Sequence, residues 1–198
     1  MEENRETKER IIDSAIECFS RYGYEGTSVD MICRSAGVSK GSFFYYFPTK
    51  QSLFLEILNF WLQDVDRAME EVNNSSEDVS SKLLNLSKVL LDIISSGERE
   101  ISLTFEFWSR ALHDRETLEK IISMFRRYRD YFSDLLSEGI KNGEFIDLDC
   151  KTASYTIIAF ALGMLIQRLF PSGEEDWEKL ARDGLEIVLA GLRNERTL

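Results

Sequence analysis

Apolar residues recur at spacings of three and four along almost the whole chain, and this pattern restricts its fold more than any other feature. Ile11, Ala15 and Phe19 lie four apart, and Leu53 and Ile57 repeat the interval further on. Such spacing places the side chains on one face of an α-helix. Glycine, proline and short polar stretches interrupt the pattern. The sequence therefore predicts an all-α fold.

About nine helices are expected, because the breaks between periodic segments are well marked. Asn142-Gly143, the polar stretch 73–78 and the sequence FPSG at 170–173 carry the loop and helix-stop residues. The expected helices cover residues 5–22, 28–36, 40–46, 49–72, 79–95, 99–112, 115–141, 149–170 and 176–193.

Length and composition indicate a soluble protein with a sizeable core. The chain has 198 residues, of which 43% are hydrophobic. Its longest apolar run, Ile157–Ile166, has ten residues, about half of what a membrane-spanning helix needs. The charged N-terminal sequence MEENRETKER has no apolar stretch behind it, which favours a cytoplasmic location and no membrane partner.

No catalytic or metal-binding pattern is recognisable. The three cysteines, Cys18, Cys33 and Cys150, lack metal-ligand spacing and lie in apolar patterns, as small buried residues do. His113 is the one histidine and lies at a helix junction, which favours a surface or capping role. GxxxxGK[ST] does not occur, and GxSxG occurs only as GVSKG at 37–41, in a stretch that lacks the strand-to-helix context of a catalytic serine. We expect no enzyme activity and no cofactor.

Charge is unevenly distributed along the chain. The formal net charge is -11, yet the segment 31–50 contains Arg34, Lys40 and Lys50 and no acidic residue. That segment carries +3, so the other residues together carry -14. A local excess of positive charge on an acidic protein indicates a face that meets an anionic partner, although short windows also fluctuate by chance.

Two short helices with a tight turn between them are predicted in the same region. Thr27 is placed to cap the first helix, Gly37 to end it, and Ser39 to cap the second. Pro48 disfavours helical backbone at the preceding residue, which limits the second helix to about 40–46. A longer helix behind such a pair gives the helix-turn-helix arrangement, whose second helix enters the DNA major groove.

The second short helix has two different faces. Phe43 and Phe47 are four apart and are expected to point inward. Ser42, Tyr45 and Tyr46 lie on another side, next to the basic start of the helix. A solvent face of hydroxyl-bearing and aromatic residues is unusual for a helix that only packs, and it favours contact with DNA.

The stretch TSVDMICRSAGVSKGSFFYYFPTKQSL, residues 27–53, resembles the DNA-binding signature of TetR-type transcriptional regulators. The stretch FEFWSRALHDRETLEKI resembles the C-terminal domain of the BetI-like branch. The resemblance implies a homodimeric repressor that a small molecule releases from a palindromic, double-stranded operator. It also implies a DNA-binding domain over residues 1–50 and a ligand-binding and dimerisation domain over 51–198, linked mechanically by the helix at 49–72.

Residues that match the signature take their expected roles from the resemblance. Thr27, Ser28 and Lys50 are expected at phosphates, and Lys40 at a phosphate or a guanine. Phe44 departs from the tyrosine common in the family and cannot donate a hydrogen bond. The full set of expected DNA contacts is Thr27, Ser28, Ser39, Lys40, Gly41, Ser42, Phe44, Tyr45, Tyr46 and Lys50.

The last two helices are expected to pair with their two-fold mates in a four-helix bundle. The dimerisation residues that this predicts are Ala153, Ile157, Phe160, Ala161, Met164, Leu185, Val188, Leu189 and Leu192. The alternative is that the small residues pack within their own chain.

Aromatic residues of the C-terminal part are candidates for lining an effector pocket, although aromatic residues at helical spacing are often ordinary core. The candidates are Trp61, Phe105, Trp108, Phe125, Tyr128, Phe132 and Tyr155. They favour an apolar or aromatic effector. Glu106 and Asp92 would select a cationic or hydrogen-bond-donating ligand if they pointed inward, but we expect them to point outward.

Two other classes of function compete with a transcriptional regulator. One is an α-helical enzyme or ligand carrier that uses the helix-turn-helix as scaffold, and the other is a protein–protein adaptor. The first lacks a recognisable nucleophile, base or phosphate loop. The second would show no salt-dependent DNA affinity to lose when Lys40 and Tyr45 are changed to alanine.

Overall fold

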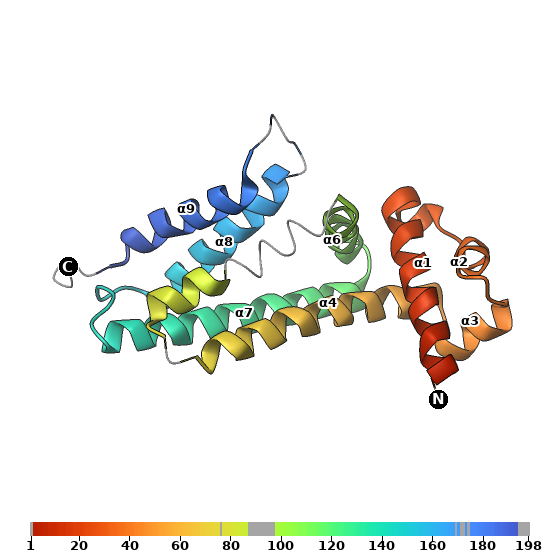
Figure 1. The fold of residues 1–198 in the computed structure, drawn as a ribbon, viewed down its shortest axis with the longest axis horizontal. Helices are drawn as coiled ribbons and strands as arrows, with labels where there is room; N and C mark the ends of the chain where they lie inside the picture. The colour runs from red at the N-terminus through yellow and green to blue at the C-terminus, as the bar shows by residue number, and fades with distance from the viewer. Residues whose placement is uncertain are drawn as a thin grey trace. The chain divides into compact units, whose positions relative to one another are not determined.

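The chain is built from α-helices (Figure 1), as predicted. The computed structural model describes residues 2–75, 77–86, 98–168, 170, 173 and 175–193. Its helices are α1 (Glu2–Gly26), α2 (Val29–Ala36), α3 (Lys40–Tyr46), α4 (Lys50–Asn73), α6 (Glu98–Ala111), α7 (Arg115–Lys141), α8 (Cys150–Arg168) and α9 (Trp177–Ala190). Residues 79–86 are also helical. The remainder of the helix predicted over 79–95 lies outside the described residues.

The helix ends follow from local chemistry, with two corrections. Ser28 caps α2 by accepting a hydrogen bond from the Met31 N–H, so the prediction of Thr27 as the cap is wrong by one residue. The predicted end of the first helix at Gly23 is a kink instead, where φ is +70° and the helix continues to Gly26. Glycine adopts this left-handed conformation at little cost, whereas other residues are strained there.

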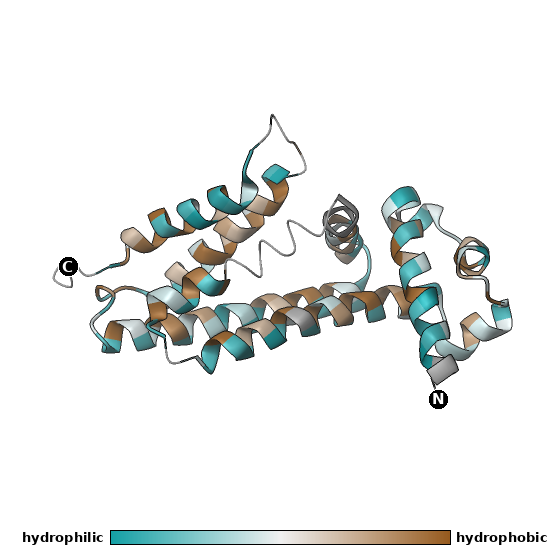
Figure 2. Ribbon diagram, in the orientation of Figure 1, coloured by the Kyte–Doolittle hydropathy of each residue, from teal (hydrophilic) through white to brown (hydrophobic). Residues whose placement is uncertain are grey.

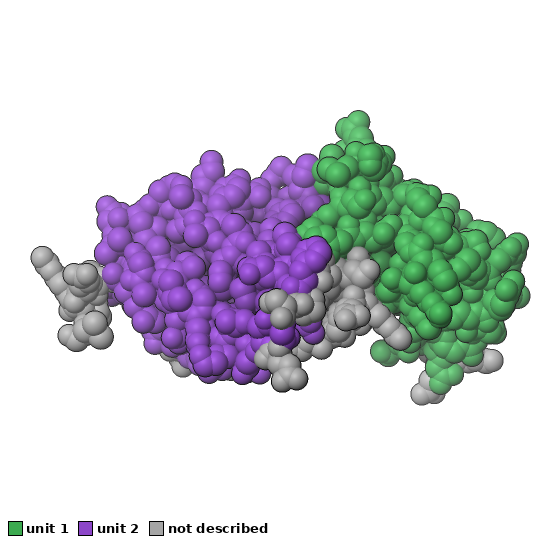
Figure 3. All heavy atoms as spheres, turned by 90° about the horizontal axis from the view of Figure 1, so that it is seen from above, with its two compact units in different colours: residues 1–64, 97–119 green, residues 65–96, 120–198 purple. Residues whose placement is uncertain are grey.

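The chain divides into two compact units (Figure 3). The first consists of residues 1–64 and 97–119, and the second of residues 65–96 and 120–198. Helix α6 therefore belongs to the same unit as α1, α2 and α3. The boundary predicted after residue 50 concerns function rather than packing, and it stays a prediction.

Aromatic rings form the centre of the first unit. Phe19 of α1 contacts Phe54 of α4 edge to face, with ring centroids 5.3 Å apart. Phe54 in turn lies 4.1 Å from Phe107 of α6. Phe43 and Phe47 are buried, which confirms that this side of α3 points inward. Helix α3 packs against α2, and the side opposite Phe43 and Phe47 faces solvent.

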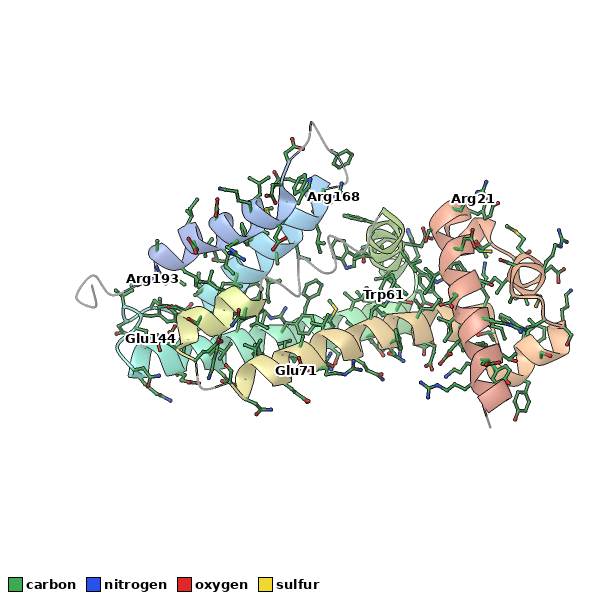
Figure 4. The ribbon with its side chains drawn as sticks, in the orientation of Figure 1. Arg21, Trp61, Glu71, Glu144, Arg168 and Arg193 are labelled. Atoms are coloured by element: carbon green, nitrogen blue, oxygen red, sulfur yellow. The ribbon has the colours of Figure 1, made fainter. Side chains whose placement is uncertain are left out.

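The second unit has a largely aliphatic core, in which glycines allow close packing of aromatic rings. Leu135 and Leu136 of α7 are buried in it with Phe145, which follows α7. A Cβ on Gly139 would lie 2.4 Å from the Phe145 ring, so only glycine lets the ring pack there. Glu144 (Figure 4) accepts hydrogen bonds from the Val79 and Ser80 N–H groups and so caps helix 79–86.

The apolar helix α8 packs against α9 in the second unit. Figure 2 shows α8 to be apolar along most of its length. Within the described residues, it is the one helix that is long and apolar enough to cross a bilayer, by length and composition alone. Several of its apolar residues, including Ile157 and Met164, are buried inside the chain. Core helices of soluble proteins show the same composition.

Candidate DNA-binding surface

The turn between α2 and α3 is held by glycine and serine. Gly37 has φ +64°, and its N–H donates to the carbonyls that end α2. Ser39 then caps α3 by accepting from the Ser42 N–H at 3.0 Å. Helix α3 ends at Phe47, whose extended backbone suits the following Pro48. The predicted helix-turn-helix is present, with α3 at its expected bounds and α2 starting one residue later than predicted.

The outer face of α3 exposes large aromatic side chains. Tyr45 is 74% exposed and Phe44 is 49% exposed, while Tyr46 is partly buried and lies edge to face against Tyr45. Exposing this much apolar area to water costs free energy that a partner surface would recover. The helix thus presents the Phe44 ring and the phenol of Tyr45 to solvent.

Gly41 lies next to this face without a packing reason for being glycine. A Cβ there would meet the Ser39 hydroxyl oxygen at 3.6 Å, an ordinary contact. Inside a helix, alanine is favoured over glycine by about 1 kcal/mol. The chain's own structure therefore accepts alanine here, and the free space lies on the solvent side, where a groove can approach the backbone.

Lys40 is paired with an acidic residue of α2. Its Nζ lies 2.6 Å from Oδ1 of Asp30, and both side chains are more than half exposed. The hydrogen bond to Asp30 raises the pKa of Lys40. Ten residues separate Asp30 from Lys40, so local spacing could not predict the pair.

Thr27 is placed differently from the expectation that its hydroxyl meets a phosphate. It is 1% exposed, and its hydroxyl lies 2.8 Å from the Gly23 carbonyl oxygen and 3.0 Å from that of Cys18. The side chain thus ties the α1–α2 connection to α1. The neighbouring Ser28 is exposed at the start of α2 and keeps its expected position.

Lys50 also turns inward rather than toward solvent. Its Nζ donates to the Tyr24 carbonyl at 2.7 Å and to the Thr27 carbonyl at 2.8 Å, and it lies 4.1 Å from the centroid of the Tyr24 ring. Burial lowers the pKa of this ammonium group. Two of its three donors are therefore engaged by the chain, and its contact with a phosphate stays a prediction.

Helix α6 holds the same connection through two charged side chains. Glu106 accepts a hydrogen bond from the Tyr24 N–H at 2.9 Å. Arg110 pairs with Glu25 at 2.8 Å, and its guanidinium lies 3.8 Å from the centroid of the Tyr24 ring. Glu106 was expected to point outward, but it is partly buried and bonded to the main chain at the end of α1. We call Tyr24, Glu25, Lys50, Glu106 and Arg110 the α1–α6 joint.

The predicted effector residues fall in both units. Trp61 (Figure 4), Phe105 and Trp108 belong to the first, and the other four to the second. All are partly buried except Tyr155, which is 49% exposed on α8. Their role in ligand binding stays a prediction. Asp92 lies outside the described residues.

One of these candidates has an unusual polar atom. The Tyr128 hydroxyl is buried without a hydrogen-bond partner of standard geometry among the described residues, and the charged side chains of Asp66 and Arg127 lie near it. Burial raises the pKa of Tyr128 to about 12, so the phenol stays neutral at physiological pH. A buried donor without a partner is rare, because leaving it unsatisfied costs about 1–3 kcal/mol.

A helix-turn-helix with a solvent-facing aromatic and hydroxyl-bearing second helix, on an all-α chain, defines a DNA-binding regulator. Comparison with known families agrees. Residues 11–57 match the bacterial regulatory proteins of the tetR family, and residues 84–190 match the C-terminal domain of the BetI-type transcriptional repressors. The chain belongs to the tetR family. It is a transcriptional regulator.

Full-length relatives share this architecture. The fatty acid metabolism regulator protein of Bacillus subtilis is 23% identical over 98% of this chain and 100% of its own. The structure of FadR from Bacillus subtilis with stearoyl-CoA is 22% identical, has a TM-score of 0.80 and covers 93% of this chain and 98% of its own. A regulator from Saccharomonospora viridis in complex with choline is 20% identical, with a TM-score of 0.83 and coverage of 96% and 100%.

Proposed function

We propose that this protein is a cytoplasmic homodimeric repressor that reads a palindromic operator with α3 and leaves it when an apolar effector binds. The observation that carries the proposal is the solvent-facing side of α3, where Tyr45 is 74% exposed on a helix whose other side is fully packed. A major groove would cover this side, and its phosphates would accept hydrogen bonds from the phenol.

The residues expected to contact DNA divide by what each can reach. Ser28 at the start of α2 and Tyr45 suit phosphates, because hydroxyls and helix N-termini bind them well. Lys40 and Ser42 suit base edges, and Phe44 suits a thymine methyl group. Gly41 keeps the backbone close to the groove. Ser39 and Tyr46 also belong to this surface. Ser39 caps α3, and the Tyr46 ring supports that of Tyr45.

The dimer is proposed to form through the exposed sides of α8 and α9. Five of the predicted residues, Ala153, Ile157, Met164, Leu185 and Leu189, are buried in their own chain, and the other four are partly buried. Burial favours a core role for the five and leaves the adjoining exposed residues for a partner. Ile187 on α9 is 75% exposed, and Leu180 and Ile166 are also exposed, which supports a helix-to-helix interface at this side.

The effector is proposed to be apolar with one polar group. The names of similar proteins support a lipid-like class, since they include a fatty acid metabolism regulator and a stearoyl-CoA complex. The buried Tyr128 hydroxyl would then meet the polar group, which satisfies a donor that is otherwise unpaired among the described residues. A choline-like cation is the second candidate, because one similar structure contains choline.

Release follows if the effector favours a spacing of the two α3 helices that does not fit DNA. The helices of a dimer must lie about 34–36 Å apart to enter successive major grooves. A coupling free energy of about 1–3 kcal/mol would lower operator affinity about 5- to 150-fold. The effector needs only this difference in affinity between the two conformations.

Binding to DNA that flanks the protein's own gene tests the proposal, with random-sequence selection if those flanks fail. We expect tight binding that weakens as salt rises, loss of most affinity in Tyr45→Ala, and release by a fatty acid, an acyl-CoA or choline. Phe60→Ala is the matched control, because Phe60 is an exposed aromatic of the same unit outside the helix-turn-helix. Equal affinities for Tyr45→Ala and the wild-type protein would contradict the assignment of this face.

A further inference from the structure

The helix-turn-helix offers little free positive charge, although its sequence contains three cations. In residues 27–50, all of which are described, Lys50 donates to two carbonyls of the chain. Lys40 is paired with Asp30 at 2.6 Å. Arg34 is exposed and forms no ion pair with a described residue. The positive charge counted from the sequence is therefore largely engaged before any DNA arrives.

This engagement matters because phosphate attraction is independent of sequence. A lysine that neutralises a phosphate releases counterions, and this term supplies essentially all of non-specific DNA binding. A lysine that must first leave a carboxylate exchanges one anion for another, so it adds little to the affinity for DNA. The carboxylate then also remains beside the phosphates and repels them.

We infer that Asp30 is a specificity-determining residue: it withholds Lys40 from phosphates and positions its ammonium group for a base edge. The inference rests on the proposed DNA-binding function and adds a residue to it. An ammonium group has three donors, so Lys40 can keep its bond to Asp30 and still donate to guanine O6 or N7. Binding to the correct operator retains the pair, whereas binding to arbitrary DNA must break it.

The geometry supports a role beyond helix stabilisation. Asp30 lies in the first turn of α2, where an acidic side chain interacts favourably with the helix dipole. That role alone does not require contact with α3. The Asp30 carboxylate instead pairs with Lys40, which is the first residue of α3.

The test compares Asp30→Asn with the wild-type full chain on two duplexes of equal length, one carrying the selected operator and one of random sequence, across a range of salt. We expect Asp30→Asn to bind the random duplex more tightly, by roughly five- to tenfold for each lysine freed near 0.1 M salt. Operator affinity should change much less, so the ratio of the two affinities falls. The salt slope on random DNA should steepen by about one per protomer.

Two further variants make the result specific. Glu119→Gln removes the same charge from an exposed ion pair with Arg115 in the same unit, and its affinity ratio should equal that of the wild-type protein. In a Lys40→Ala background, Asp30→Asn should no longer change random-DNA binding, because the effect runs through Lys40.

Three outcomes overturn the inference. Equal strengthening on both duplexes would show that Asp30 only repels DNA, and no change on either would show an ion pair without a function. An unchanged effect of Asp30→Asn in the Lys40→Ala background would show that Lys40 is not involved. If the wild-type protein binds neither duplex even at low salt, the proposed DNA-binding function itself fails and the inference falls with it.

Discussion

At the scale of single residues, the direction of a polar side chain decides its function. Lys40 and Lys50 are both lysines at the first position of a helix, yet one faces solvent and the other donates to the Tyr24 and Thr27 carbonyls. The Tyr24 carbonyl lies in the last turn of α1, after the kink at Gly23, and the Thr27 carbonyl lies between α1 and α2. Lys50 is thus held at the end of α1 by main-chain acceptors.

Replacing Lys50 tests whether its bonds to the two carbonyls stabilise the fold. Lys50→Met keeps the length of the side chain and removes both hydrogen bonds, so we expect the free energy of unfolding to fall by about 1–3 kcal/mol. Denaturation by urea measures it. Operator binding should weaken without a change in its salt slope if the ammonium group keeps its bonds to these carbonyls on DNA. A smaller slope with unchanged stability would instead support a phosphate contact.

Local signals explain why the helix-turn-helix could be predicted and several of its contacts could not. Ser39 as a cap, Gly37 as a stop and Pro48 as a limit act within a few residues of the helix ends they determine. The partners of Asp30 and Glu106 lie in other helices. Only the tertiary fold brings such pairs together, so neither partner was found from spacing.

The predicted dimerisation residues show a related limit of sequence spacing. Apolar spacing identifies the sides of α8 and α9 that avoid water, but it does not distinguish burial in the same chain from burial against a partner. The structure buries Leu185 and Leu189 in their own unit and exposes Ile187. The two roles are separated by less than one turn of the same helix.

At the scale of elements, α6 is attached to the α1–α2 connection through charged groups rather than through apolar packing alone. Glu106 accepts from a main-chain N–H, and Arg110 contacts both the Glu25 carboxylate and the Tyr24 ring. Charge-assisted bonds are strong and strict in geometry. A displacement of α6 would therefore move the segment that precedes α2, or break these bonds.

Removing the Glu106 carboxylate should weaken this attachment. Glu106→Ala leaves the Tyr24 N–H without its partner, and we expect the free energy of unfolding to fall by about 1–3 kcal/mol. Chemical denaturation gives this value, and an operator titration with and without effector gives the coupling between the sites, which should decrease. Ser109→Ala, an exposed position on the same helix, is the control. A variant with full stability and full effector response would contradict the role of the joint.

At the scale of the whole molecule, the proposed operator binding depends on two chains. Two copies of α3 would read a palindrome, so a dimer interface would determine whether both can enter the grooves together. The exposed apolar residues of α8 and α9 are the surface that a second copy would cover. The assembly and the reading of DNA should therefore be lost together.

Placing a charge on this surface tests the assembly. Ile187→Glu should shift the mass in sedimentation to that of one 23.0 kDa chain and lower operator affinity, because an unpaired carboxylate would be buried at the interface. Ile122→Glu is the control, since Ile122 is an exposed isoleucine of α7. A dimeric mass for Ile187→Glu at low protein concentration would place the interface elsewhere.

The bond between Glu106 and Tyr24 has a consequence for how such a regulator can evolve. It ends on a main-chain N–H, which every residue type except proline supplies. Substitutions that adapt α2 and α3 to a new operator leave this contact chemically intact. The DNA-binding helices and the proposed effector-binding part can therefore diverge independently in sequence. Chimeras that exchange residues 27–50 between relatives should keep their response to the original effector.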